Sequence, residues 1–121
     1  MKDGLPSEHK EQSDLITWWN EWGPKHRYPE YALFAIPNGG LRNQRTSAML
    51  KQEGVRPGVP DLFLALNGGL WIEMKRRWGG IVSPAQSCFH MFLWQQGFKV
   101  RVCHGADEAK REILKHLEIE E

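Results

Sequence analysis

Two acidic residues stand inside otherwise apolar segments in the middle of this 121-residue chain. Asp61 opens the segment DLFLAL, and Glu73 lies within LWIEMK, two residues before Lys75. Side chains two positions apart on a β-strand point to the same face of the sheet, so Glu73 and Lys75 share a face. A carboxylate in an apolar strand is costly to bury unless it is paired or bound to a metal ion. The pattern fits either a structural ion pair between Glu73 and Lys75 or a functional site.

The register of the hairpin between these two segments decides whether Asp61 joins the other two groups. A three-residue turn over 67–69 places Lys75 opposite Asp61 and Glu73 opposite Phe63, with the three polar groups on one face. A two-residue turn would send Asp61 to the other face. A functional site therefore predicts an even register, meaning that the numbers of paired residues add up to an even number.

Two carboxylates beside one ammonium group leave a surplus of negative charge, which favours a hard divalent cation. Oxygen ligands select magnesium or manganese over zinc, so Mg²⁺ or Mn²⁺ is the expected cofactor. Such a site suits hydrolysis of a phosphodiester, because the metal polarises the phosphoryl group and lowers the pKa of a bound water. A lysine can orient that water and stabilise developing charge. Asp61, Glu73 and Lys75 are thus the first candidates for catalysis.

Glu8 is a further candidate, near the start of the first predicted helix. On a helical wheel it falls in the middle of the apolar face formed by Leu15, Trp19 and Trp22, and Glu11 falls to one side. This position allows Glu8 to reach the carboxylate site. The alternative is an exposed first turn in which Glu8 only favours the helix dipole.

Gln86 belongs to the segment Ser83-Pro84-Ala85-Gln86, which has the form of a capping box with proline at the first helical position. In a capping box the glutamine side chain reaches back to the backbone of the capping residue. Gln86 can serve as a cap, reach the carboxylate site, or do both.

Basic residues gather in the middle of the chain. Residues 25–101 carry eleven Lys and Arg but four acids, a net charge of +7, whereas residues 1–24 and 102–121 each carry −3. A basic middle indicates a polyanion partner such as DNA, and the alternative is that two acidic helices simply face solvent. The cations close to the acidic strands are candidates for DNA phosphate contacts, or else ordinary surface charges. They are Arg42, Arg45, Lys51, Arg76 and Arg77.

Apolar periodicity, caps and turns predict one α/β domain over residues 1–121, in the order α-β-α-β-β-α-β-α. The strand after the third helix follows a crossover, so part of the sheet should be parallel. We expect a mixed sheet of about four strands with helices on its faces. The predicted helices are 7–23 (ended by Gly23-Pro24), 44–53, 83–97 and 106–117, and the predicted strands are 31–36, 61–66, 70–75 and 98–104.

Several other classes of protein and site are disfavoured. There is no apolar run long enough for a membrane span and no secretory signal, and the two cysteines are far apart, so we expect a reduced, intracellular, cytoplasmic protein. The five histidines lack metal-ligand spacing, and GxSxG, P-loop and GxGxxG motifs are missing. Among six tryptophans, Trp19, Trp22 and Trp94 are expected in the core. Trp71 and Trp78 are expected to pack in the core or in a dimer rather than to stack on bases.

The motifs together resemble those of VRR-NUC domains, a family of the PD-(D/E)XK nuclease superfamily. The resemblance covers nearly the whole chain, and its most specific part is the GVPD block at this distance from EMK and Gln86. It rests on Pro37-Asn38-Gly39-Gly40-x-Arg42, Gly54-Val55-x-Pro57-Gly58-Val59-Pro60-Asp61-Leu62, Glu73-Met74-Lys75, Gly80, Ser83 and Gln86.

The resemblance implies a restriction-endonuclease-like fold and metal-dependent cleavage of DNA. Asp61, Glu73 and the main-chain carbonyl of Met74 would hold the metal, and Lys75 would assist the water. Glu8 would match the family's first-helix glutamate, and Gln86 its helix glutamine. Many relatives carry an aromatic residue four positions after that glutamine, where this chain has His90.

Stand-alone members of the family resemble phage and bacterial proteins, and some act as homodimers on branched DNA such as Holliday junctions; fused members occur in larger repair nucleases. We therefore expect a structure-selective DNA endonuclease that acts as a homodimer, because a small chain offers little surface for a junction and two-fold symmetry supplies two sites. The alternatives are a non-catalytic DNA-binding module, a flap or end-processing nuclease, and a nuclease of RNA. No nucleotide cofactor is expected.

Overall fold

The computed structural model describes residues 4–37 and 46–119. Arg42, Arg45 and the motif residues 38–40 lie outside the described residues. Within them, four strands form one mixed sheet in the order β1-β2-β3-β4. β1 pairs with β2 and β2 with β3 in antiparallel fashion, whereas β3 and β4 are parallel, as the crossover predicts. The strands are β1 (Leu33–Ala35), β2 (Leu62–Leu64), β3 (Leu70–Lys75) and β4 (Lys99–His104).

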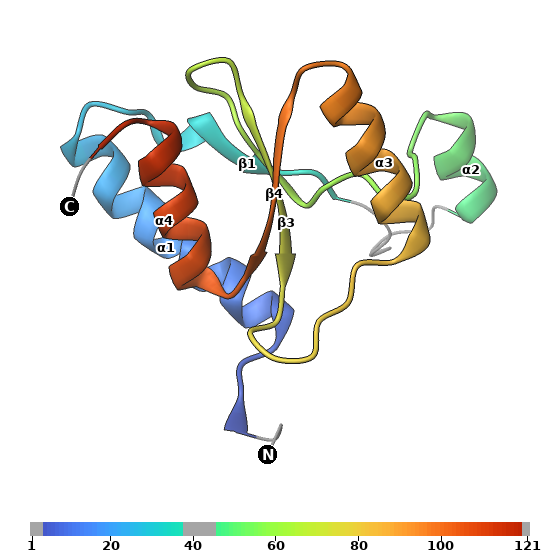
Figure 1. Ribbon diagram of the computed structural model, residues 1–121, viewed down its shortest axis with the longest axis horizontal. Helices are drawn as coiled ribbons and strands as arrows, with labels where there is room; N and C mark the ends of the chain where they lie inside the picture. Colours follow the sequence, from blue (N-terminus) through green and yellow to red (C-terminus); the bar gives the residue numbers. More distant parts are fainter. Residues whose placement is uncertain (1–3, 38–45, 120–121) are drawn as a thin grey trace.

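The helices lie on both sides of this sheet. Figure 1 shows α1 and α4 together on one side and α3, with α2 beyond it, on the other. The order of elements confirms the predicted mixed α/β fold. The helices are α1 (Glu8–Lys25), α2 (Ser47–Gln52), α3 (Pro84–Gln95) and α4 (Ala106–His116), and a short 3-10 helix, η2 (Glu30–Ala32), precedes β1.

The main core lies between the sheet and the α1–α4 pair. Leu62 and Ile72 from the strands are fully buried there, with Trp19 of α1 and Ile113 of α4. The indole N–H of Trp19 donates to the carbonyl of Glu30 at 3.0 Å, which satisfies the one polar group of this large side chain.

The first helix does not stop at Gly23-Pro24 as predicted but continues to Lys25. Gly23 lies directly against the Trp19 ring, since a Cβ at this position would be 3.0 Å from the ring. Glycine at position 23 therefore serves close packing rather than termination. The helix then ends with the N–H of His26 donating to the Gly23 carbonyl.

The turn between β2 and β3 is longer than predicted, but the register of the two strands is even, as predicted. Leu64 pairs with Leu70, so five residues form the turn instead of three, while the register remains even. The Leu66 carbonyl is the reason: it accepts the N–H of Gly69 within the turn and the ring nitrogen of His116 from α4 at 2.7 Å. Leu66 is therefore unavailable to β3. The predicted pairs Lys75–Asp61 and Glu73–Phe63 are therefore wrong: Phe63 pairs with Trp71, and continuing the observed register by one step places Asp61 opposite Glu73.

The prediction that Trp94 lies in the core is wrong. Trp19 is buried, but Trp94 is 54% exposed. Trp78 is 69% exposed, so it does not pack in the core, and its packing in a dimer stays a prediction. Trp94 is exposed because α3 buries only His90 and Leu93 against the sheet, leaving its outer face to solvent. Both cysteines are free, with Cys88 exposed and Cys103 buried. None of the helices within residues 4–37 and 46–119 has the length and apolar character that crossing a membrane requires.

Candidate active site

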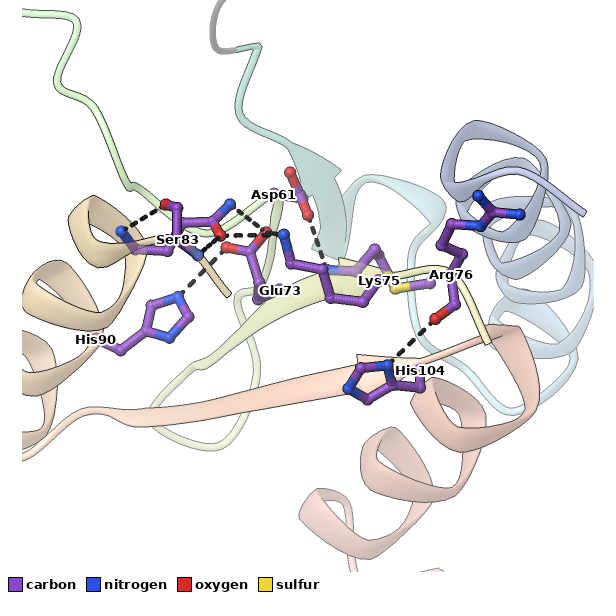
Figure 2. A network of polar contacts seen from close by, with 9 residues as sticks. Asp61, Glu73, Lys75, Arg76, Ser83, His90 and His104 are labelled. Atoms are coloured by element: carbon purple, nitrogen blue, oxygen red, sulfur yellow. Dashed lines mark hydrogen bonds and ion pairs between the residues drawn. The ribbon is translucent and has the colours of Figure 1, made fainter. Parts of the chain in front are cut away.

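Glu73 lies at the centre of a cluster of polar side chains between β3 and α3 (Figure 2). Its carboxylate is buried and accepts the side-chain N–H of Gln86 on Oε2 at 3.0 Å. The ammonium group of Lys75 is 3.9 Å from the same oxygen, and Nε2 of His90 is 3.3 Å from Oε1. Glu73 and Lys75 are thus both buried on one face of β3, as their spacing predicts, and the ion pair between them is one part of a larger network.

Asp61 lies beside this cluster, directly before β2. Its Oδ2 accepts the backbone N–H of Met74 at 2.7 Å. The carbonyl of Lys75 accepts from Gly105 on the β4 side, so the backbone groups of the preceding Met74 point the other way, towards Asp61. The Met74 carbonyl therefore lies on the same edge of β3 as the Asp61 carboxylate.

Gln86 connects the cluster to the first turn of α3. Its Oε1 accepts from Lys75 Nζ at 3.0 Å and from the backbone N–H of Ser83 at 2.8 Å. The Ser83 hydroxyl in turn accepts the backbone N–H of Gln86 at 3.2 Å, which completes the predicted capping box. The amide of Gln86 therefore caps the helix and contacts both Glu73 and Lys75, which is the double role that the sequence left open.

The electrostatics of the cluster favour the binding of positive charge. Burial raises the pKa of Glu73 to about 9, and the negative charges of Asp61 and Glu8 add to this effect, while the positive charge of Lys75 partly opposes it. Burial lowers the pKa of His90, and the positive charge of Lys75 lowers it further. His90 is therefore held neutral beside a carboxyl group that keeps its proton up to about pH 9 unless further positive charge is supplied.

Glu8 is the first residue of α1 and is half-buried, close enough to the cluster for its charge to affect Glu73. Ser7 caps this helix as predicted, accepting the N–H of Lys10 at 3.0 Å. The prediction that Glu8 occupies the middle of the buried face is wrong, because the fully buried carboxylate of α1 is Glu11.

Glu11 was missed as a candidate, although it lies four residues before Leu15 on the stripe that faces the core. Its Oε1 accepts the backbone N–H of Ala106 at 2.9 Å, and its Oε2 is 3.3 Å from Nε of Arg77. Glu11 thus caps the start of α4 and binds the segment after β3. Its burial is explained by these two partners, which Glu8 lacks.

The candidate DNA-contact residues that the structure describes differ in exposure and in their partners. Lys51 is exposed on α2, whereas Arg76 is partly buried and its Nε has no hydrogen-bond partner among the described residues. Arg77 is half exposed and paired with Glu11, so it has a structural role that the sequence did not indicate. Whether these three residues contact DNA stays a prediction.

An open groove of about 430 Å³ leads from the surface to Asp61 and Gln86. The loop before β2 forms one side, and the first turn of α3 forms the other. Gly58 lies where these sides meet: it has a φ of +87°, and a Cβ there would be 2.3 Å from the Ala85 carbonyl oxygen. Only glycine fits this contact and conformation, which accounts for its place in the GVPD block.

A model of the VRR-NUC domain family matches residues 5–107 of the chain. The chain belongs to the VRR-NUC domain family. A solved structure described as "VRR_NUC domain protein" is similar to it, with a TM-score of 0.80 and 22% sequence identity over 94% of this chain and 90% of the other. Among curated proteins, none matches the chain. Membership in the family implies a nuclease-type function in DNA processing.

The donor atoms of this VRR-NUC site suit a magnesium or manganese ion. No group of three or more His, Cys, Asp or Glu side chains within the described ranges is arranged to hold a metal. Magnesium does not require such a group, because it is commonly held by one or two carboxylates and keeps several waters. Asp61 and Glu73 supply two carboxylates, and the Met74 carbonyl faces the same edge. The hard oxygen donors and the raised pKa of Glu73 fit a divalent cation.

Proposed function

We propose that this VRR-NUC domain is a Mg²⁺- or Mn²⁺-dependent deoxyribonuclease that hydrolyses phosphodiester bonds. The observation that carries the proposal is the buried Glu73 beside Asp61, with Lys75 on the same face and 3.9 Å from the Glu73 carboxylate. Asp61, Glu73 and the Met74 carbonyl would hold the cation. When bound, the cation would polarise the scissile phosphate and lower the pKa of an attacking water.

Lys75 is the residue that we assign to the water and to the charge developing on the phosphate. Its ammonium group is buried and held by the Gln86 oxygen at 3.0 Å, so its position is fixed before a substrate arrives. A fixed charge stabilises a transition state without the cost of reorienting it during the reaction. Glu8, which affects Glu73 electrostatically, is placed to add a further acidic group.

Branched DNA is the proposed substrate, and a homodimer the proposed assembly. The proposed site lies at the groove that leads to Asp61 and Gln86, so a two-fold dimer would present two copies of this site to two strands. The outer face of α3 supports self-association, because three large apolar side chains there are about half exposed. They are Met91, Phe92 and Trp94. Sedimentation at micromolar concentration should give a dimer, and a monomer at all concentrations would contradict this part of the proposal.

Cleavage of a substrate panel tests the nuclease activity. Junction, flap, splayed-arm and continuous duplex DNA are incubated with Mg²⁺ and with EDTA, beside matched RNA. The purified protein should cut branched DNA only when the divalent ion is present. Asp61→Ala should bind the same DNA without cutting it, and Asp107→Asn, which alters an exposed carboxylate of α4, should cut like the parent.

The alternatives give different results in this panel. Binding without cleavage under every condition would indicate a non-catalytic module. Preference for flaps or ends would indicate an end-processing nuclease, and preference for RNA would change the substrate class. Undiminished cleavage by Asp61→Ala would show that the site is wrongly assigned.

A further inference from the structure

A short turn directly after the proposed catalytic lysine exposes two large apolar side chains. Residues 77–79 form the turn, and Trp78 is 69% exposed while Ile81, just after it, is 81% exposed. Single exposed apolar residues are ordinary on protein surfaces. Here two of them occur within four positions, starting three residues after Lys75.

The turn is anchored at both ends. Before Trp78, the carbonyl of Arg76 accepts from Nδ1 of His104 at 3.1 Å, and the Arg77 guanidinium pairs with buried Glu11. After Trp78, Gly80 packs so closely on the end of β3 that a Cβ there would be 2.8 Å from Cβ of Lys75. Trp78 therefore projects from a fixed part of the backbone, and Figure 2 shows the hydrogen bond from His104 to Arg76 that anchors it.

The charges around the turn favour a nucleic acid over an apolar protein surface. Two arginines lead into the turn. Arg76 is partly buried with an Nε that has no hydrogen-bond partner among the described residues, and Arg77 is half exposed although it pairs with Glu11. Backbone phosphates are attracted to such cations, which brings neighbouring bases close to Trp78. Any base that is not paired can stack on an exposed indole ring, because every base presents a π-face. Apolar side chains such as isoleucine also enter between base steps.

We infer that Trp78, supported by Ile81, is a stacking platform for an unpaired base next to the scissile phosphate. The inference rests on the proposed nuclease function and narrows its substrate to DNA with unpaired or unstacked nucleotides at the cleavage position. Arg76 and Arg77 position the backbone of this DNA, and Trp78 selects for the unpaired base.

Binding without metal separates this inference from the nuclease proposal. Splayed-arm DNA carrying 2-aminopurine at the first unpaired position, and a continuous duplex of the same sequence, are titrated in EDTA with the parent, Trp78→Ala, Trp78→Phe and Tyr31→Ala. Tyr31 is the matched control, an aromatic residue of η2 that is 82% exposed. Trp78→Ala should weaken splayed-arm binding about tenfold and leave duplex binding unchanged, because one base stack is lost. Trp78→Phe should retain most of the affinity, and Tyr31→Ala all of it.

The same variants are then assayed for cleavage with Mg²⁺. Equal affinity of Trp78→Ala and parent for splayed arms, with cleavage intact, would overturn the stacking platform and leave the nuclease standing. Loss of stacking in Trp78→Ala, with no cleavage by any protein, would support the platform and contradict the nuclease. Equal weakening on both DNAs, or conversion of a dimer to a monomer by Trp78→Ala, would overturn the platform in favour of a general contact or a contact between two copies.

Discussion

The side-chain oxygen of Gln86 accepts a hydrogen bond from Lys75 Nζ at 3.0 Å, although the two residues lie on different elements, α3 and β3. The amide nitrogen of Gln86 donates to Glu73 at 3.0 Å at the same time. The side-chain amide of Gln86 thus fixes both Glu73 and Lys75 of β3 relative to the start of α3. The same amide is part of the cap of that helix.

Gln86→Ala should therefore lower both stability and activity. Loss of half the capping box should cost about 1 kcal/mol of unfolding free energy. Loss of the contacts to Lys75 and Glu73 should reduce kcat at least about tenfold, because the ammonium group is no longer held in place. Urea unfolding and single-turnover cleavage measure the two effects.

Ser83→Ala is the control for the helix cap. It removes the hydroxyl that accepts the Gln86 N–H but leaves the Gln86 side chain. It should cost a similar amount of stability with much less loss of kcat. If both variants lost kcat equally, Gln86 would act only through the helix cap.

Lys75→Met should lower kcat by about 10²- to 10³-fold with little change in DNA affinity, because a charge placed for the transition state is removed. Methionine has a similar length and no charge, so packing is largely kept. Lys25→Met, at an exposed position near the end of α1, is the matched control and should change neither value. A loss of DNA affinity equal to the loss of kcat would show that Lys75 serves ground-state binding instead.

Stability in EDTA should fall as the pH rises, because of Glu73. Its pKa is raised in the folded protein from an ordinary value of 4.5 to about 9, so the folded state holds a proton that the unfolded state has released. The stability from this proton is full below pH 4.5, declines above it, and is lost as the pH passes about 9. Glu73→Gln should flatten the pH dependence of the unfolding free energy in this range. Glu21→Gln, at an exposed position, should leave it unchanged, and an equally steep dependence in Glu73→Gln would contradict the assignment.

Mn²⁺ should raise the melting temperature by a few degrees when it is present well above its dissociation constant, since binding to the folded state adds roughly 1–3 kcal/mol. Asp61→Asn should reduce this increase while folding normally in EDTA. Calorimetry with and without the ion measures the effect independently of cleavage. An undiminished increase in Asp61→Asn would place the ion elsewhere.

Arg77→Ala should destabilise the fold by about 2 kcal/mol, because it leaves the buried Glu11 carboxylate without its cation. The cost is below that of a fully buried pair, since the Arg77 side chain is half exposed. Arg111→Ala, at an exposed position of α4, is the control and should change stability by less than about 0.5 kcal/mol. Urea unfolding measures both effects. If the two substitutions lowered stability equally, Arg77 would be an ordinary surface charge and its pairing with Glu11 would not stabilise the fold.

The sequence predicts the order of elements and the shared face of Glu73 and Lys75, because both follow from local periodicity. It also predicts the even register, but it misses the length of the hairpin turn, which depends on a contact from His116 some fifty positions away. For the same reason it selects Glu8 rather than Glu11 as the buried acid of α1. The two partners of Glu11, Arg77 and the start of α4, are distant in the chain, and helical periodicity alone cannot reveal them.

His90 is a second residue whose spacing can be read from the sequence but whose contact cannot. Its spacing of four residues from Gln86 places both on one face of α3, and this spacing was visible in the sequence. Only the fold shows that this face meets Glu73, with the imidazole 3.3 Å from the carboxylate.

The contact at Gly58 joins the loop that carries Asp61 to the first turn of α3, with no space for even a methyl group between them. Asp61 and Gln86 are therefore parts of one rigid frame, and neither can swing away without the other. The entropy cost of bringing these site residues together is therefore incurred when the chain folds, not when DNA binds. Discrimination among substrates then falls to the shape of the DNA that fits the groove as it stands.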